Sequence, residues 1–193
     1  MSDLLIKMPL QYEPLRKNRW ILRFPADLGI QEWYVASANR PGVSQTAKPI
    51  PFLNSETYVA GRYVWDTLNV TLNDPIGPSA SQAVMEWERL HSESITGRQG
   101  YAAGYKRDVE LVMLDPTGVA VQLWILKNCF IDNVKFGELT YSDDGVAQIT
   151  MTLRPDYCIF AAMHQRVQED VLHVVHLSDV EWRRTLQAYS QYQ

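Results

Sequence analysis

The sequence predicts an all-β domain, an antiparallel β-sandwich or open barrel with one packed helix, followed by an α-helical extension. Three observations support this prediction. Segments in which apolar and polar residues alternate recur between residues 19 and 153. Turn-forming residues separate them, such as the run DPTG at 115–118. One stretch, residues 79–91, instead has the apolar spacing of an amphipathic helix.

The chain of 193 residues is expected to divide into an N-terminal arm (1–17), a β-domain (18–159) and a helical C-terminal extension (160–193). Its composition, 46% hydrophobic and 21% charged, is sufficient for a normal core. The net charge is −4 and Lys and Arg do not cluster, so no site for gripping nucleic acid is expected. No apolar run approaches the roughly 20 residues that span a bilayer, and no export signal is visible, so we expect assembly in the cytoplasm and no membrane partner.

The first strands are expected to form a hairpin. Residues 19–24 alternate in character, with Trp20 and Leu22 on one face. A turn at 26–29 leads into residues 32–36, which we expect to pair with the first strand.

Residues 40–55 contain prolines that lack the N–H group of a sheet ladder. Pro49 and Pro51 are therefore expected to keep this segment from pairing within a sheet. Its apolar side chains still need cover, so we expect the segment to dock on a neighbouring subunit. The expected interface residues are Ile50, Phe52, Leu53, Tyr58 and Val59.

The helix expected at 79–91 begins with a capping box, Ser79 followed by Gln82. Its buried face should pack on the sandwich through residues that recur at helical spacing, namely Ala80, Ala83, Val84, Trp87 and Leu90. Glu86, Glu88 and Arg89 should point outward, where they are candidates for contact with an outer protein layer. Residues 92–105 contain three glycines and are expected to form a mobile loop.

Five further segments predict the remaining strands. Residues 63–72 form one, residues 109–114 pair with 119–130, and residues 136–141 pair with 146–153. The apolar sides of the strands and the helix supply the expected core residues Leu68, Val70, Ile149, Met151 and Trp87.

The spacing of apolar residues becomes helical from Phe160 onward, and Ser178 with Glu181 forms a second capping box. The C-terminal residues are therefore expected to form a helical appendage with a narrow apolar stripe, suited to lying on a surface.

The residues that bond-breaking chemistry needs are not arranged for it. His164, His173 and His176 could in principle hold a metal, but no second ligand pair accompanies them, and exposed helix histidines are the simpler interpretation. Cys129 and Cys158 lie in apolar segments without a CxxC pattern and are expected to be reduced core residues. We therefore expect no catalytic, metal or cofactor site.

Two further patterns have structural explanations. The adjacent Asp143 and Asp144 fit a turn better than an acid–base pair, and residues 97–100 lack the lysine and flanking strand of a phosphate loop. Six tryptophans and ten tyrosines leave open a carbohydrate-type binding sandwich. The patterns around Trp20 and Trp124 favour core positions, while Trp33 and Trp65 remain open.

The sequence resembles the tail-tube proteins of contractile-tailed, T4-like bacteriophages, which are structurally akin to the type VI secretion tube protein. The resemblance covers roughly residues 15–160. One part lies in residues 54–74, where an Ala-Gly step leads into RYVWDTLNVTLND, and in residues 83–87, where Trp87 takes the place of the family's helix tryptophan. The other part is NVKFGEL at 133–139, DDGVAQITMTL at 143–153, and the closing Asp156 and Tyr157.

The resemblance implies a virion protein that forms stacked hexameric rings, with four strands of each subunit lining a DNA conduit. Its implied partners are further copies of itself, the sheath, the baseplate and tape-measure proteins, and genomic DNA that passes without specific binding. The chain continues to Gln193, beyond the family pattern, and residues 92–106 have no clear match. A baseplate protein that forms the first tube ring is therefore an alternative, and a monomeric ligand-binding β-sandwich is another.

Overall fold

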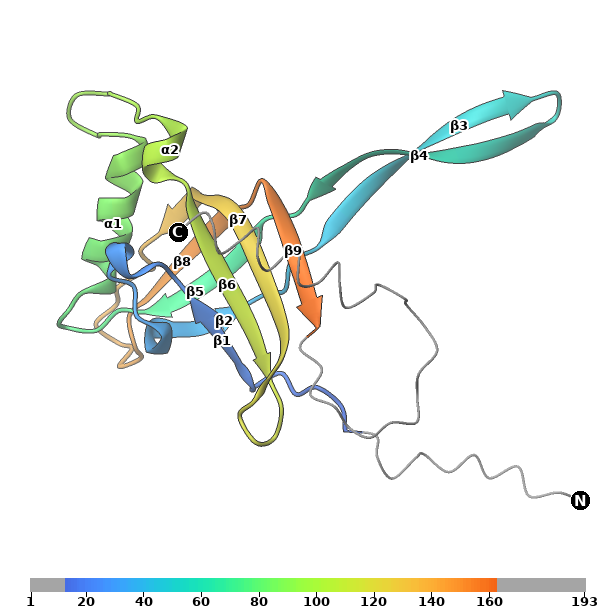
Figure 1. The fold of residues 1–193 in the computed structure, drawn as a ribbon. Coiled ribbons are helices and arrows are strands. Elements are labelled where there is room, and N and C mark those ends of the chain that lie inside the picture. The colour runs from blue at the N-terminus through green and yellow to red at the C-terminus, as the bar shows by residue number, and fades with distance from the viewer. Residues whose placement is uncertain (1–12, 163–193) are drawn as a thin grey trace, which may run out of the picture. The chain divides into compact units, whose positions relative to one another are not determined.

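The computed structural model describes residues 13–162 and consists mainly of antiparallel strands (Figure 1). Residues 163–193 of the expected helical extension, with the three histidines considered for metal binding, lie outside the described residues. The strands are β1 (Trp20–Arg23), β2 (Val35–Ala38), β3 (Val43–Phe52), β4 (Ser55–Trp65), β5 (Leu68–Asn73), β6 (Arg107–Leu114), β7 (Ala120–Lys135), β8 (Gln148–Arg154) and β9 (Tyr157–Ala162). The helices are α1 (Ala80–His91), α2 (Ala102–Tyr105) and two 3-10 turns, Ala26–Leu28 and Glu32–Tyr34.

Two sheets share the long strand β7 and enclose the core. Sheet A has the order β1-β6-β7-β9, and sheet B has the order β2-β5-β8-β7, with every pairing antiparallel. The first half of β7 pairs with β6 and β9, and its last part, from Phe130 to Lys135, pairs with β8. The predicted all-β sandwich is therefore confirmed.

β7 changes sheets at Asn128, whose φ is 56°. Asparagine is among the few residues that adopt this left-handed conformation readily. The Asp108 carboxylate on β6 holds it there, because Oδ1 accepts a hydrogen bond from the Asn128 backbone N–H at 2.9 Å and Oδ2 accepts one from Lys127 Nζ at 2.6 Å. One carboxylate thus fixes the bend that joins the two sheets.

The core lies between the sheets and under α1. The predicted core residues Leu68, Val70, Ile149, Met151 and Trp87 are all at most 2% exposed. α1 contributes Ala80, Ala83, Val84 and Trp87 to this core. The Trp87 indole Nε1–H donates to the backbone carbonyl of Tyr105 at 2.7 Å, which satisfies its polar group where the ring is buried.

The N-terminal end of α1 is held by side-chain oxygens. Ser79 is the N-cap, as predicted, and its Oγ accepts a hydrogen bond from the Gln82 backbone N–H. The capping box is not completed, because the Gln82 side chain donates to Glu86 Oε1 instead. Asp74, at the end of the preceding segment, accepts from the Ser81 backbone N–H at 3.1 Å and so satisfies another orphan donor of the first turn.

The predicted hairpin of residues 19–24 with 32–36 is wrong. β1 pairs with β6, β2 pairs with β5, and Glu32–Tyr34 is a 3-10 turn. The turn at 26–29 carries the chain from sheet A to sheet B, so the two short strands lie in different layers of the sandwich. Both find partners from distant parts of the sequence, which local turn signals do not reveal.

Three other predicted boundaries are also wrong. Residues 63–72 form parts of two strands, β4 and β5, which are interrupted at 66–67. Residues 136–141 are a loop, because β8 pairs with the end of β7 instead. Phe160 does not begin a helix but lies in β9 opposite Trp124, and the rings are 4.6 Å apart. The predicted pairing of 109–114 with 119–130 is confirmed in β6 and β7.

Candidate subunit-interaction surfaces

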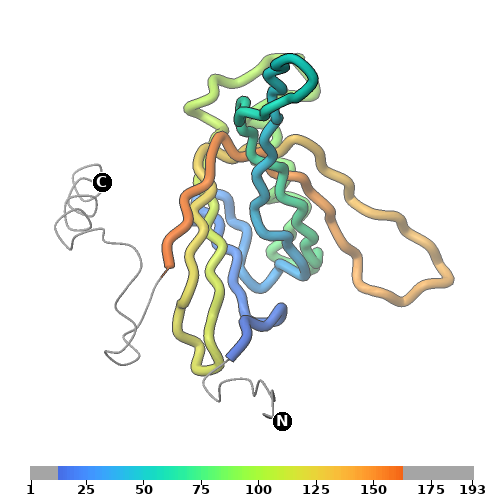
Figure 2. The backbone as a smooth tube through the Cα atoms, turned by 90° about the vertical axis from the view of Figure 1, so that its right-hand side faces the viewer, coloured from blue at the N-terminus to red at the C-terminus, as the bar shows by residue number. Residues whose placement is uncertain are grey.

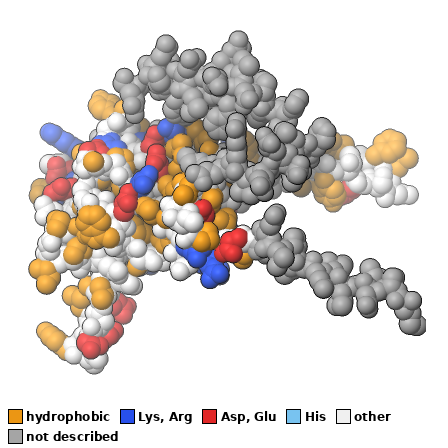
Figure 3. All heavy atoms as spheres, turned by 60° about the horizontal axis from the view of Figure 1, so that its bottom comes forward, with side chains coloured by type: hydrophobic (Ala, Val, Ile, Leu, Met, Phe, Trp, Pro, Cys, Tyr) orange, Lys and Arg blue, Asp and Glu red, His pale blue; other side chains and the backbone are white. Residues whose placement is uncertain are grey.

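The β3–β4 hairpin projects from the sandwich as a separate two-stranded sheet (Figure 1). It runs from the pair Val43–Trp65 at its base to Phe52–Ser55 at its tip. Every β3 residue is exposed, as are most of β4. In the space-filling view, hydrophobic side chains gather on this projection at the right of Figure 3. The sequence predicted these residues as an interface, but it predicted no pairing, and that part of the prediction is wrong.

Both prolines fit into the hairpin because β3 has β4 on one side only. Alternate residues of an antiparallel strand point their N–H groups to the same edge, so Pro49 and Pro51 share one edge. A proline is tolerated where that edge carries no ladder hydrogen bond, and a two-stranded ribbon offers such an edge along its whole length. The prolines therefore mark an edge strand.

The predicted interface residues all lie on this hairpin and are exposed. Phe52 is 72% exposed, Leu53 90% and Tyr58 64%, and Ile50 and Val59 are each nearly half exposed. Leu53 occupies the tip with a φ of 53°, a left-handed conformation that is uncommon for leucine. Such large apolar exposure on an element without a core of its own is typical of an interaction surface.

The outward face of sheet B is a second surface, and it is polar. Its side chains form rows across β2, β5, β8 and the end of β7, namely Ser37, Asn69, Thr71, Asn73, Asn133, Gln148, Thr150 and Thr152. Several of them bond one another: Thr152 Oγ1 donates to Asn69 Oδ1 at 3.0 Å, and Gln148 Nε2 donates to Asn73 Oδ1 at 3.1 Å. Lys135 ends one of these rows, and Arg154 of β8 forms an ion pair with Asp132 at 2.9 Å.

The outward residues of α1 differ in part from the prediction. Glu86 and Arg89 are exposed, as expected for a surface that could meet another protein. Glu88 is turned inward, with Oε1 3.5 Å from Nδ1 of His91. Leu90 is 45% exposed and does not belong to the core, so its predicted burial is wrong. The other four predicted residues, Ala80, Ala83, Val84 and Trp87, are buried, so the buried stripe ends one turn before Leu90.

Residues 92–105 are more regular than the predicted loop. Ser92 forms a bridge with Gln99, and the Gly100 N–H donates to the carbonyl of His91 at 2.9 Å. A side chain at Gly100 would collide with the Leu90 carbonyl oxygen at 1.9 Å, so glycine permits this close return. Ile95 and Tyr101 are almost fully exposed on this excursion.

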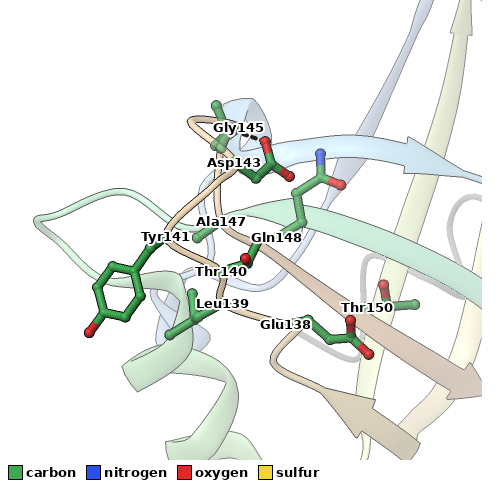
Figure 4. A pocket seen from close by; sticks show the side chains of 11 residues that line it. Glu138, Leu139, Thr140, Tyr141, Asp143, Gly145, Ala147, Gln148 and Thr150 are labelled. Atoms are coloured by element: carbon green, nitrogen blue, oxygen red, sulfur yellow. Dashed lines mark hydrogen bonds between the residues drawn. The ribbon is translucent and has the colours of Figure 1, made fainter.

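The loop of residues 136–147 stands out from the body in Figure 2 and encloses an open cleft of 610 Å³. Figure 4 shows the Tyr141 ring pointing away from the other labelled side chains of this cleft. Asp143 Oδ1 accepts a hydrogen bond from the Gly145 N–H at 2.9 Å, so this aspartate forms a turn, as predicted. The cleft is lined by this exposed loop and by Gln148 and Thr150 of β8.

The cysteine thiols are buried, and their environment keeps them in the unreactive protonated form. Cys129 and Cys158 are unpaired in the structure. Burial raises the pKa of Cys158 to about 11 and raises that of Cys129 further, so both stay protonated near neutral pH. Among residues 13–162, no group of three His, Cys, Asp or Glu side chains is arranged to hold a metal ion. No helix in that part of the chain is long and apolar enough to span a bilayer.

Of the five tryptophans within residues 13–162, all except Trp33 pack in or against the core. Trp20, Trp65 and Trp124 are partly buried and pack against the core. Trp33, which the sequence left open, is 74% exposed beside Tyr34. The exposed aromatics Trp33, Phe52 and Tyr58 lie on different elements, so they do not form the single aromatic platform of a carbohydrate module.

No protein-family model matches the chain, and no curated protein matches it. Solved structures do. The structure of the anti-feeding prophage tube-terminating cap contains a chain with a TM-score of 0.63 and 16% identity, over 84% of this chain and 99% of that one. A chain of the PVC extracellular contractile injection system sheath–tube complex has a TM-score of 0.62 and 15% identity, over 79% and 94% of the two chains.

A chain in the anti-feeding prophage baseplate has a TM-score of 0.56 and 12% identity, over 78% of this chain and 97% of that one. These matches span nearly the whole of the known chains, and they come from structures of a tube-terminating cap, a sheath–tube complex and a baseplate. At this identity, the likeness concerns the fold. The chain has the tail-tube-like β-sandwich fold that is found in contractile injection systems.

Proposed function

We propose that this protein is a structural subunit of the tube of a contractile tail or injection particle, assembling as stacked hexameric rings inside a sheath. The observation that carries the proposal is the exposed apolar β3–β4 hairpin, on a sandwich whose fold occurs in tube structures. An apolar projection that no other residue of 13–162 covers is suited to holding copies together.

The ring would close through the edges of sheet B. Among the described strands, β2 pairs on one side only, with β5, and residues Phe130–Lys135 of β7 pair within sheet B only with β8. Joining the β2 edge of one copy to the β7 edge of the next would remove unpaired edges, which are the main liability of an antiparallel sheet. A heterologous contact of this kind closes into a ring when its rotation fits.

The polar face of sheet B would then line the channel. Most side chains on this face are uncharged amides and hydroxyls, and some of them hydrogen-bond to one another. They therefore offer few strong contacts to a passing polymer. Duplex DNA would then pass without being held. Each phosphate that pairs with Lys or Arg releases counterions, and such pairs would slow translocation, but this face offers few of them. Glu86 and Arg89 on α1 are proposed to face the sheath, and baseplate and tape-measure proteins are proposed partners at the tube ends.

A subunit of a single starting or terminating ring is the second candidate. Two observations favour it: the matched structures include a tube-terminating cap and a baseplate, and the chain continues beyond the sandwich by some thirty residues. Such a protein would form one ring and stop. A monomeric ligand-binding sandwich would form no ring, and its purified mass would remain 22.2 kDa.

Cryo-electron microscopy of the purified full-length protein tests these alternatives directly. Long helical tubes of six-subunit rings support the tube subunit. Isolated rings that do not stack support the starting or terminating ring. A protein that stays monomeric over a wide concentration range, with or without sheath protein, contradicts both assignments.

A further inference from the structure

Residues 92–105 form an ordered excursion that holds one tyrosine out from the body. The Glu93 N–H donates to the Arg98 carbonyl at 2.9 Å, and the Gly104 N–H donates to the Tyr101 carbonyl at 2.8 Å. Tyr101 lies directly before α2 and is 91% exposed. Tyrosine is among the residues that most often anchor protein interfaces, because its ring buries a large area while its hydroxyl can still form a hydrogen bond. An exposed ring on a fixed backbone is therefore a candidate anchor.

The excursion begins and ends beside one of the two sheet edges that ring closure would join. The Tyr105 ring lies 6.0 Å from the ring of Phe130, and the His91 ring lies 5.9 Å from it. Phe130 is the first residue of the β7 segment Phe130–Lys135, whose other edge is unpaired among the described strands. Tyr101 precedes Tyr105 by about one helical turn, a rise of about 5.4 Å, so it lies close to this edge.

The other joining edge, that of β2, borders an open cleft of 390 Å³, which we call the β1–β2 cleft. Trp20, Leu111 and Met113 line it from sheet A, and residues 36–38 line it from β2. Lys17 and Arg40 also line it, and neither has an ion-pair partner within residues 13–162. An apolar lining with a few polar groups is typical of a cleft that receives a specific ligand. This cleft suits an aromatic ring that carries a hydroxyl.

The β1–β2 cleft and the excursion lie at the same end of sheet B. Arg40 leaves β2 beside the start of β5, because the Asn39 N–H donates to the Asn69 carbonyl at 3.2 Å. Phe130 lies opposite Arg154 at the end of β8, which is the end that pairs with the start of β5. In Figure 1, α2 stands at the upper left and the chain enters β1 at the bottom, so the two features do not meet within one copy. They would come together where the β2 edge of one copy joins the β7 edge of the next.

We propose that Tyr101 of each copy inserts into the β1–β2 cleft of the adjacent copy in the same ring. Its ring would pack on Trp20 and Met113, and its hydroxyl would accept a hydrogen bond from Arg40 or Lys17. This inference rests on the proposed ring assembly and adds a side-chain anchor to the joined strands.

The anchor would fix the register of the joined edges. β2 has only four residues, and its outward face is polar. A short strand of this kind specifies its register weakly, because a slip loses few pairs and buries no wrong residue. A tyrosine seated in a cleft allows one register only.

Photo-crosslinking in assembled rings tests the contact. Benzoylphenylalanine would replace Tyr101, and the variant would be assembled together with isotope-labelled wild type so that crosslinks between copies can be recognised. After illumination and digestion, it should be joined to labelled peptides that contain Trp20, Ser37 or Met113. The same probe at Ile95, which is 92% exposed on the same excursion, is the control and should not reach these peptides. Crosslinks from position 101 only within its own copy, or only to other parts of the neighbour, would overturn the inference.

Substitutions on both sides of the contact give an independent readout. Tyr101→Asp and Ala36→Trp, which narrows the cleft, should each raise the protein concentration needed for ring formation about tenfold or more, as for loss of an interface anchor. Tyr101→Phe and Ile95→Asp should stay within about threefold of the wild type. Because both changes disrupt one contact, the double variant Tyr101→Asp with Ala36→Trp should be little worse than either single variant.

Circular dichroism and melting of the isolated subunits should be unchanged in all variants, which separates assembly from folding. Normal ring formation by Tyr101→Asp, or fully additive effects of the two changes, would overturn the anchor while the rings themselves remain. If the wild type forms no rings at all, the proposed function fails, and the anchor fails with it.

Discussion

At the scale of single residues, a few side chains hold the sandwich in register. Asp108 fixes the bend at Asn128 through two hydrogen bonds, and Asp115 closes the β6–β7 turn by accepting from the backbone N–H groups of Thr117 and Val119 at 2.8 and 2.9 Å. The Thr117 hydroxyl, which donates to Asp115 Oδ1 at 2.7 Å, and these backbone bonds hold the pKa of Asp115 below its ordinary value, because they favour the ionised form.

Trp87 should be the most costly residue of α1 to truncate. It is 2% exposed, stands edge-on to Phe24 with ring centres 6.3 Å apart, and donates to the Tyr105 carbonyl. Trp87→Ala should lower the free energy of unfolding by about 3–5 kcal/mol, the usual cost of removing a buried aromatic ring. Urea denaturation measures it, with Leu90→Ala as the exposed control on the same helix. A loss below about 1 kcal/mol for Trp87→Ala would contradict its core role.

Asp74 should make stability depend on pH. Partial burial acts to raise its pKa, but hydrogen bonds from the Ser81 side chain and backbone and from Ser79 outweigh that effect and hold it below the ordinary 3.8. Because the folded pKa is depressed, its stabilising effect is present above 3.8 and is lost as pH falls through the folded pKa.

Asp74→Ala should therefore cost about 1 kcal/mol near pH 7, which is typical for loss of an N-terminal helix cap. The gap to the wild type should narrow below pH 3.8. Thermal melts of both proteins between pH 2.5 and 7 measure this. A difference that stays constant down to the lowest pH would show that the Asp74 charge is not what stabilises the helix.

At the scale of elements, the hairpin and the sandwich are separate in stability. β3 and β4 pair with each other. Among the residues of these two strands, Trp65 at the base packs against the core. The sandwich has its own closed set of strand pairs and its own buried cluster. A change at the tip should therefore affect assembly without affecting folding.

Shortening the hairpin should separate these two properties. Replacing residues 46–62 with Asn-Gly joins Gln45 to Tyr63, which already face each other, through the favoured two-residue turn. We expect the melting temperature to stay within a few degrees of the wild type, and stacking into tubes to be lost. Sedimentation and electron microscopy report the second property. Normal tubes from the shortened protein would show that the hairpin has no part in assembly.

At the scale of the whole molecule, the proposed assembly uses two kinds of surface: a polar face for the channel and an apolar hairpin for contacts between subunits. Sheet B presents a polar, largely uncharged face, and its end carries the apolar hairpin. The net charge of −4 gives no general attraction for nucleic acid. A conduit needs this combination, because its subunits must adhere to one another and not to what passes through.

Basic residues introduced on the sheet B face should turn the channel into a DNA-binding surface. Thr71 and Thr150 lie opposite each other on β5 and β8 with their side chains on that face. In assembled rings, Thr71→Lys with Thr150→Lys should create tight binding of duplex DNA that weakens steeply with salt, whereas the wild type should show none. Glu86→Lys alone, on the exposed side of α1, makes the same change of two charges elsewhere and serves as the control. Equal DNA binding by both variants would show that this face does not line the channel.

The sequence by itself determined the elements whose signals are local. The capped helix with Trp87, the DPTG turn between β6 and β7, and the alternation in β5 and β8 follow from short-range spacing, and the structure places them as expected. The sequence also predicted an interface at Ile50, Phe52 and Tyr58; the structure shows that all three are exposed, and their role in an interface stays a prediction.

Only the tertiary structure decided which strands pair and where each apolar residue finds cover. β1 and β2 look like a local hairpin, but they lie in different sheets. Each strand buries its apolar side chains by pairing in its own layer, and this burial stabilises the chain more than a local hairpin pairing would. Phe160 fits a helical spacing, yet stacks on Trp124 from a strand. Pro49 and Pro51 are compatible with pairing because β3 pairs only with β4 among the described strands. Strand pairing joins residues far apart in sequence, so its energy depends on contacts that no local window contains.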